Sequence, residues 1–145
     1  MFKHILVPVD GSATSQLAVS KAIGLAQAFD SRVSAIFVID PYPFTGVGSD
    51  FAYGQAEYLS AASAQANAAI KTTKAQFEAA GVAVETSVVE SHNAWRGIVQ
   101  AAESLAADLI VMGSHGRSGL EKLVLGSVAQ AVLSHTHLPV LVVRD

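Results

Sequence analysis

Short runs of hydrophobic residues recur along the chain and predict β-strands. Four runs are almost unbroken and rich in valine, isoleucine and leucine, whereas a fifth, Val82–Val89, alternates between apolar and polar positions. Unbroken runs are typical of strands covered on both faces, and alternation favours an edge position. The four unbroken runs are His4–Val9, Arg32–Ile39, Leu109–Met112 and Leu138–Val143.

Segments with apolar residues three or four positions apart separate these runs and predict helices. Ser12 and Asn93 are suitable N-caps, and Gly81 ends the second helical segment. Alternating strands and helices favour right-handed crossovers. We therefore expect a single α/β domain over residues 1–145, with three layers in which helices cover both faces of a parallel sheet. The apolar helix faces comprise Ala18, Ala22, Leu25, Ala26 and Phe29; Leu59, Ala62, Ala66, Ile70, Thr73 and Phe77; Ile98, Ala102 and Leu105; and Val128, Val132 and Leu133.

One long stretch, Pro41–Gly54, carries neither pattern and is expected to be irregular. Its sequence, PYPFTGVGSDFAYG, is too aromatic for a flexible linker. A surface loop packed on its own side chains is the simpler interpretation, and a lid or a partner contact is the alternative.

Composition narrows the range of partners and compartments. The formal net charge is -3 and no basic cluster is present, which argues against nucleic acid as the main partner. The absence of cysteine excludes disulfides and thiolate metal sites. The N-terminal apolar run is too short for a signal peptide, and no run approaches the roughly 18 apolar residues of a membrane helix. We therefore expect a soluble cytoplasmic protein with no membrane partner.

A glycine-rich segment follows the fourth predicted strand. Gly113, Gly116 and Gly119 come directly after the strand, and Gly126 and Ser127 begin another apolar segment. Glycine allows a close approach of the backbone, and a helix start offers unpaired N–H groups to an anion. The segment therefore predicts a phosphate-binding loop.

Asp10 follows the first predicted strand and provides a second candidate group. In open α/β sheets, ligands bind beyond the carboxyl ends of the strands where neighbouring connections diverge. If the first and fourth strands are neighbours, Asp10 faces the glycine loop, and its carboxylate can accept hydrogen bonds from a ribose diol. This combination predicts a nucleotide site, and the alternative role for Asp10 is to support the helix cap at Ser12.

The spacing Gly113-x2-Gly116-x9-Gly126-Ser127 resembles the universal stress protein family, in its ATP-binding branch. The flanking sequences VMGSHGRSG and LPVLVV and the N-terminal ILVPVDGS carry the same resemblance, which covers essentially the whole chain. The resemblance implies a five-stranded parallel sheet of order 3-2-1-4-5 (Rossmann-like, adenine nucleotide α-hydrolase-like), ATP at the switch point, and a homodimer.

The resemblance also implies roles for individual residues. Asp10 would hold the ribose, with Gly113 nearby, and backbone groups around Val38 would meet the adenine. Pro8, at the same strand end as Val9, is also expected to contact the nucleotide. Mg²⁺ would be carried on the phosphates rather than in a protein cage. The apolar walls would be Val9 and Met112, and the phosphates would contact Gly116, Gly126, Ser127 and Val128.

Two side chains inside the glycine loop are candidates on their own chemistry. His115 is placed to donate to a phosphate, and the alternative is an exposed loop histidine. Arg117 is the natural local cation for a polyphosphate, ahead of Lys122.

Outside the loop, His135 and His137 have the spacing of a metal pair but lack a carboxylate at ligand spacing, and histidine is favoured at a helix C-terminus in any case.

The turn before the third helical segment departs from the family pattern. Family members often carry Gly-x-Pro there, whereas this chain has Glu90-Ser91-His92-Asn93-Ala94-Trp95. Trp95 is expected to pack on the sheet, and the alternative is that it lines the ligand cleft.

The sequence offers little equipment for catalysis, and no catalytic residue is predicted. It has no Gly-Lys pair of a Walker motif, no Gly-x-Ser-x-Gly elbow and no acidic cluster of a phospho-receiver domain. At most slow ATP hydrolysis is expected. The main alternative is a homodimeric structural or interaction protein, paired through the apolar edge strand Leu138–Val143, in which nucleotide is incidental.

Overall fold

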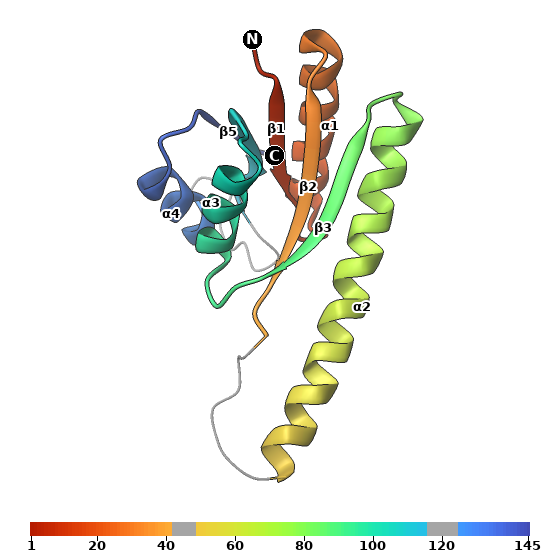
Figure 1. Ribbon diagram of the computed structural model, residues 1–145, viewed down its shortest axis with the longest axis vertical. Helices are drawn as coiled ribbons and strands as arrows, with labels where there is room; N and C mark the ends of the chain where they lie inside the picture. Colours follow the sequence, from red (N-terminus) through yellow and green to blue (C-terminus); the bar gives the residue numbers. More distant parts are fainter. Residues whose placement is uncertain (42–48, 116–124) are drawn as a thin grey trace.

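The computed structural model describes residues 1–41, 54–115 and 125–145, and the backbone but not the side chains of residues 49–53. Five parallel strands form one sheet in the order β3-β2-β1-β4-β5 (Figure 1). The α/β fold predicted from the strand and helix pattern is confirmed, as is the strand order implied by the resemblance. The elements are β1 (His4–Pro8), α1 (Ala13–Phe29), β2 (Arg32–Ile39), α2 (Ser49–Ala79), β3 (Val84–Glu90), α3 (Ala94–Ser104), β4 (Leu109–Gly113), α4 (Ser127–His135) and β5 (Val140–Val143).

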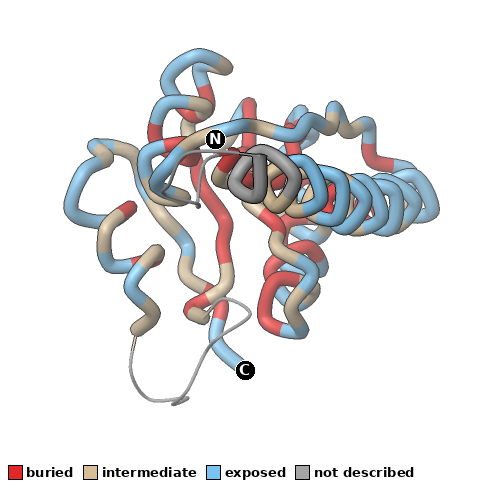
Figure 2. The backbone as a smooth tube through the Cα atoms, turned by 90° about the horizontal axis from the view of Figure 1, so that it is seen from below, coloured by how far each residue is buried: buried red, intermediate tan, exposed pale blue. Residues whose placement is uncertain are grey.

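The sheet separates two hydrophobic cores, because successive residues of a strand point to opposite faces. Ile5 and Val7 of β1 pack with α1 and α2, whereas Leu6 packs with α3 and α4. Figure 2 shows buried residues along the central strands and mostly exposed residues along α2. The predicted inner faces of the helices are confirmed at positions such as Ala22 in α1 and Phe77 in α2, both fully buried. The prediction is wrong for Phe29 and Leu133, which are exposed.

Several predicted strand boundaries shift by one or two residues. β1 ends at Pro8 instead of Val9, and β4 continues through Gly113. β3 covers Val84–Glu90 and lies at the edge of the sheet, as its alternating pattern predicted. β5 begins at Val140, two residues later than predicted, because Pro139 has no N–H to donate to a sheet ladder.

The prediction of an irregular stretch over Pro41–Gly54 is wrong from Ser49 onward. There α2 has already begun, while residues 42–48 of the stretch lie outside the described residues. A single internal glycine costs a helix only about 1 kcal/mol, so Gly54 does not end it. The amino-terminal turns of α2 extend beyond the carboxyl ends of the strands in Figure 1.

No helix within the described segments is long and apolar enough to span a bilayer.

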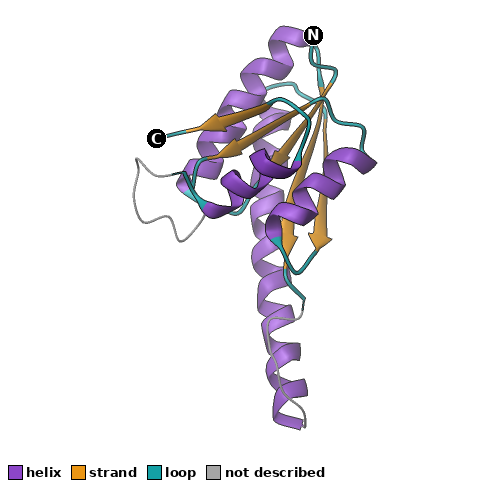
Figure 3. Cartoon of the chain, turned by 90° about the vertical axis from the view of Figure 1, so that its left-hand side faces the viewer, coloured by secondary structure: helices purple, strands orange, loops and turns teal. Residues whose placement is uncertain are grey.

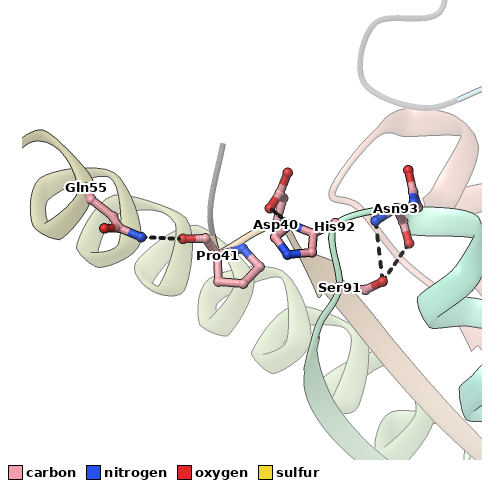
Figure 4. Close-up of polar contacts among 6 residues, drawn as sticks. All are labelled: Asp40, Pro41, Gln55, Ser91, His92 and Asn93. Atoms are coloured by element: carbon pink, nitrogen blue, oxygen red, sulfur yellow. Dashed lines mark hydrogen bonds and ion pairs between the residues drawn. The ribbon is translucent and has the colours of Figure 1, made fainter. Parts of the chain in front are cut away.

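Two of the three predicted helix boundary signals act as expected. The Ser15 N–H donates to Ser12 Oγ at 3.1 Å, so Ser12 caps α1. Gly81 has φ +75°, a conformation that favours glycine, directly after α2. Asn93 occupies the N-cap position of α3, but its side chain makes no capping hydrogen bond. Instead, Ser91 Oγ donates to the Asn93 carbonyl at 2.9 Å (Figure 4).

Candidate functional site

β1 and β4 separate near their carboxyl ends, and this divergence positions the candidate site. Their pairing extends only to Leu6 and Ile110, whereas β1 stays paired with β2 as far as Pro8. β4 stays paired with β5 through Gly113. Figure 3 shows the strands fanning apart toward their carboxyl ends. Such a divergence is the switch point at which open α/β sheets bind ligands.

Asp10 lies just beyond β1 and contacts the start of α1. Its Oδ1 accepts a hydrogen bond from the Ser12 N–H at 2.9 Å, and its own N–H donates to Ser15 Oγ at 3.2 Å. Gly11 between them has φ +82°, which turns the chain into the helix. The cap-supporting role considered for Asp10 is therefore present, yet it occupies only one carboxylate oxygen. Within the described residues, Oδ2 has no hydrogen-bond partner.

Gly113 brings the end of β4 against the same turn of α1. A Cβ atom on Gly113 would lie 2.9 Å from Thr14 Cγ2 and 3.1 Å from the Thr14 carbonyl carbon. Thr14 and Ser15 are both buried, so the turn cannot easily retreat. Because Ser15 contacts Asp10 and Thr14 contacts Gly113, the first turn of α1 holds these two predicted site residues near each other.

Gly126 brings the start of α4 to the end of β4. Its N–H donates to the Ser114 carbonyl at 2.7 Å, and a Cβ on Gly126 would lie 2.7 Å from that same oxygen. The glycine is thus required by the protein's own backbone, in addition to any contact with a phosphate. Ser127 follows as the first residue of α4, where backbone N–H groups lack partners within the helix.

His115 is half-buried, unlike the exposed loop histidine considered from the sequence. Its Nδ1 lies 3.0 Å from Ser114 Oγ, and its Nε2 is buried without a hydrogen-bond partner in the structure as described. A buried polar atom without a partner is costly unless a ligand satisfies it. Among the described residues at this edge, His115 is therefore the side chain whose buried, unpaired polar atom a ligand could satisfy. Gly116, Arg117 and Lys122 lie outside the described residues.

The apolar residues predicted to contact the nucleotide do not all lie on one side of the sheet. Val9 and Met112 are both buried, but they belong to the cores on opposite faces of the sheet, so their side chains do not face each other. Val38, near the end of β2, is half-buried and lies close to α3, where a Cβ on Gly97 would be 3.0 Å from Val38 Cγ1. Val128 is half-buried in the core between α3, α4 and the sheet.

A hydrogen-bond contact that the sequence did not reveal joins the ends of β2 and β3. His92 Nδ1 lies 3.2 Å from Asp40 Oδ1, and Gln55 of α2 donates to the Pro41 carbonyl at 3.2 Å (Figure 4). His92 belongs to the turn that departs from the Gly-x-Pro pattern of the family, whereas Asp40 follows β2. The only sequence signal of the contact was position, since Asp40 directly follows β2 and His92 lies two residues beyond the end of β3, at the carboxyl edge of the sheet.

Trp95 is partly buried against the core between α3, α4 and the sheet, but the aromatic ring that it stacks on belongs to α4 and not to a strand. Its ring stacks on His135 with centroids 4.0 Å apart and an interplanar angle of 22°, and Arg96 lies 5.2 Å from its centroid. The stacking ties the first turn of α3 to the last residue of α4. His135 Nδ1 also donates to the Ala131 carbonyl at 2.7 Å. No cluster of three metal-ligating side chains occurs in the described parts of the chain.

Comparison with known proteins identifies the family. Residues 1–144 match the model of the universal stress protein family. The chain belongs to this family. It is 41% identical to universal stress protein MJ0531 of Methanocaldococcus jannaschii over 145 residues, which cover 99% of this chain and 83% of that protein.

Solved structures of the family share the fold. The universal stress protein UspA from Lactobacillus plantarum superposes with a TM-score of 0.87 at 26% identity, covering 98% of this chain and 97% of that one. A universal stress protein in complex with cAMP gives a TM-score of 0.71 at 25% identity, over 99% and 97% of the two chains. At least one structural relative of this chain therefore binds an adenine nucleotide.

Proposed function

We propose that this chain is a single nucleotide-binding domain that binds ATP at the divergence of β1 and β4. The observation that carries the proposal is the convergence of Asp10, Gly113, His115 and Gly126 at that edge, made by contacts among α1, β4 and α4. Among the described residues, the group combines a carboxylate oxygen without a hydrogen-bond partner, a buried ring nitrogen without one, and the start of a helix. A ribose and a chain of phosphates have the complementary chemistry.

Each part of the nucleotide has a partner in this proposal. Asp10 Oδ2 accepts a hydrogen bond from a ribose hydroxyl, and the backbone near Val38 meets the adenine. The phosphates extend past His115 to the N–H groups at the start of α4, with Mg²⁺ carried on their oxygens. The further predicted contacts are Pro8, Val9, Met112, Gly113, Gly116, Arg117, Gly126, Ser127 and Val128.

The relative in complex with cAMP supports adenine as the base. The choice of ATP over a monophosphate rests on the long run of predicted phosphate-binding positions in the sequence, from Gly116 to Val128. A monophosphate would leave most of that run without a role. Mg²⁺ belongs to the proposal for the same reason, since a triphosphate carries the negative charge that holds it.

The bound ATP serves signalling or stress protection in the cytoplasm rather than rapid turnover. The sequence has no Walker lysine and no evident residue to position an attacking water, so any hydrolysis is slow. Binding would instead change the surface that the protein presents to its partners.

Calorimetric titration with ATP and Mg²⁺ tests the proposal, with Asp10→Asn as the informative variant. The asparagine keeps an oxygen for the Ser12 N–H but replaces the second acceptor with a donor. We expect affinity to fall about tenfold, the loss of one charge-assisted hydrogen bond. Asp30→Asn, at the other end of α1, is the matched control and leaves affinity unchanged. Absence of heat from the unaltered protein at millimolar ATP would refute the proposal.

A second function, homodimerisation in which nucleotide is incidental, is favoured by the β5 edge. Leu141 of β5 is 40% exposed and Leu133 of α4 is 44% exposed. An apolar edge strand gains cover by pairing with the same strand of a second copy. Light scattering over a dilution series tests this, with Leu141→Lys expected to shift the protein to monomers. A protein that is monomeric at every concentration would exclude the dimer.

A further inference from the structure

Ser114 is held by backbone hydrogen bonds through both its N–H and its carbonyl. It is 1% exposed, its N–H donates to the Val143 carbonyl at 2.8 Å, and its carbonyl accepts from Gly126 at 2.7 Å. These bonds attach it to the end of β5 and to the start of α4. The backbone from which the Ser114 side chain extends is therefore held in place. Ser114 Oγ lies 3.0 Å from His115 Nδ1.

Hydrogen-bond accounting decides which group of this pair is the donor. If the Ser114 hydroxyl donates to Nδ1, the imidazole proton is on Nε2, and one buried group, that N–H, lacks a partner. If Nδ1–H donates to the hydroxyl instead, both the serine proton and the Nε2 lone pair lack partners among the described residues. A protonated imidazole also leaves two donors without acceptors. The first arrangement leaves the fewest buried groups unpaired and is the most stable.

We infer that Ser114 is a positioning residue that presents His115 Nε2–H as a donor to an anionic oxygen of the ligand. The inference deepens the proposed function and rests on it for the identity of the ligand as a nucleotide phosphate. It assigns the tautomer of the ring and the chemical class of its partner, which must be an acceptor. A base amino group or another donor would leave two donors facing each other.

The chain contains a matched control at the opposite end of the sheet. Ser34 Oγ lies 2.8 Å from His4 Nε2, and both residues are buried between β1 and β2. Ser34→Ala therefore removes a buried serine hydroxyl bonded to a histidine without touching the candidate site. Comparison with Ser114→Ala separates positioning from a general loss of stability.

Nitrogen-15 NMR of the ligand-free protein tests the ring assignment, with the His115 signals identified by their absence in His115→Gln. We expect an unprotonated Nδ1 and a protonated Nε2, a mixture of tautomers in Ser114→Ala, and unchanged His115 signals in Ser34→Ala. A protonated Nδ1 in the unaltered protein would overturn the inference whether or not the protein binds nucleotide.

Affinities for ATP and adenosine test whether His115 donates to a phosphate, because adenosine has none. Ser114→Ala should weaken ATP binding about three- to tenfold, through loss of an ordered donor, and leave adenosine affinity unchanged. Ser34→Ala should change neither. Equal loss for ATP and adenosine, or no loss for ATP, contradicts the positioning role. If the unaltered protein binds no ATP, the proposed function fails, while the ligand-free spectra still decide the Ser114 assignment.

Discussion

Gly113 approaches Thr14 so closely that a Cβ on the glycine would lie 2.9 Å from the threonine Cγ2. This contact is where β4 meets the first turn of α1. It connects the glycine-rich end of β4 with the turn that also holds Asp10. The contact is therefore a structural requirement of the candidate site as well as of the fold.

Replacing Gly113 with alanine should destabilise the protein by about 1–3 kcal/mol, because the new methyl group also meets the Thr14 backbone, which cannot rotate away. Urea denaturation measures the loss. Gly24→Ala is the control, since a Cβ there has nothing within 4 Å and alanine favours a helix. Equal stability of Gly113→Ala and the unaltered protein would show that α1 and β4 can separate at no cost.

Thr73→Val should stabilise the protein by about 1 kcal/mol, because Thr73 Oγ1 is buried with no hydrogen-bond partner in the described parts of the chain, and valine conserves the side-chain volume. Thr72→Val is the neighbouring control. Thr72 is exposed and donates to the Ala68 carbonyl at 3.1 Å, so its substitution should change stability by less than about 0.5 kcal/mol. A destabilised Thr73→Val variant would mean that the hydroxyl has a partner in solution.

Asp108 should make stability depend on pH at the acidic end. Partial burial opposes ionisation of Asp108, but N–H donation from Lys3 at 2.8 Å and from His4 at 3.1 Å outweighs it, and the pKa is lowered. A carboxyl with a lowered folded-state pKa stabilises the protein above its unfolded-state pKa, and the contribution is lost as pH falls through the folded-state pKa.

Asp108→Asn should therefore cost about 1 kcal/mol at neutral pH, with the difference from the unaltered protein vanishing in strong acid. Urea denaturation across the acidic range measures this, and Glu103→Gln on the exposed face of α3 controls for loss of a charge. A difference that persists unchanged in acid would assign the effect to packing instead of ionisation.

The buried strands could be predicted from sequence because each is a run of apolar residues, covered on both faces by helices. Ile5, Leu6 and Val7 illustrate this, since all three are fully buried although neighbours point to opposite cores. The start of α2 could not be predicted, because glycine and aromatic residues around Gly54 are equally typical of a loop. Local composition there does not show that the chain has already entered a helix.

The candidate site was predicted by glycine spacing and by the position of Asp10 after a strand. Two of its features depend on contacts that spacing does not encode. The Asp40–His92 hydrogen bond joins residues 52 positions apart in sequence, across the ends of β2 and β3. The fixed position of Ser114 depends on its hydrogen bonds to Val143 and Gly126, which only the assembled sheet brings together.

The most direct test of the central claim is a titration of the nitrogen-15 labelled protein with ATP and Mg²⁺, followed by amide NMR. Binding at the divergence of β1 and β4 predicts saturable shifts at Asp10, Gly113, Ser114 and Ser127, with little change at the amino ends of the strands around His4. An absence of shifts at millimolar ATP, or shifts confined to residues away from that edge, would contradict it.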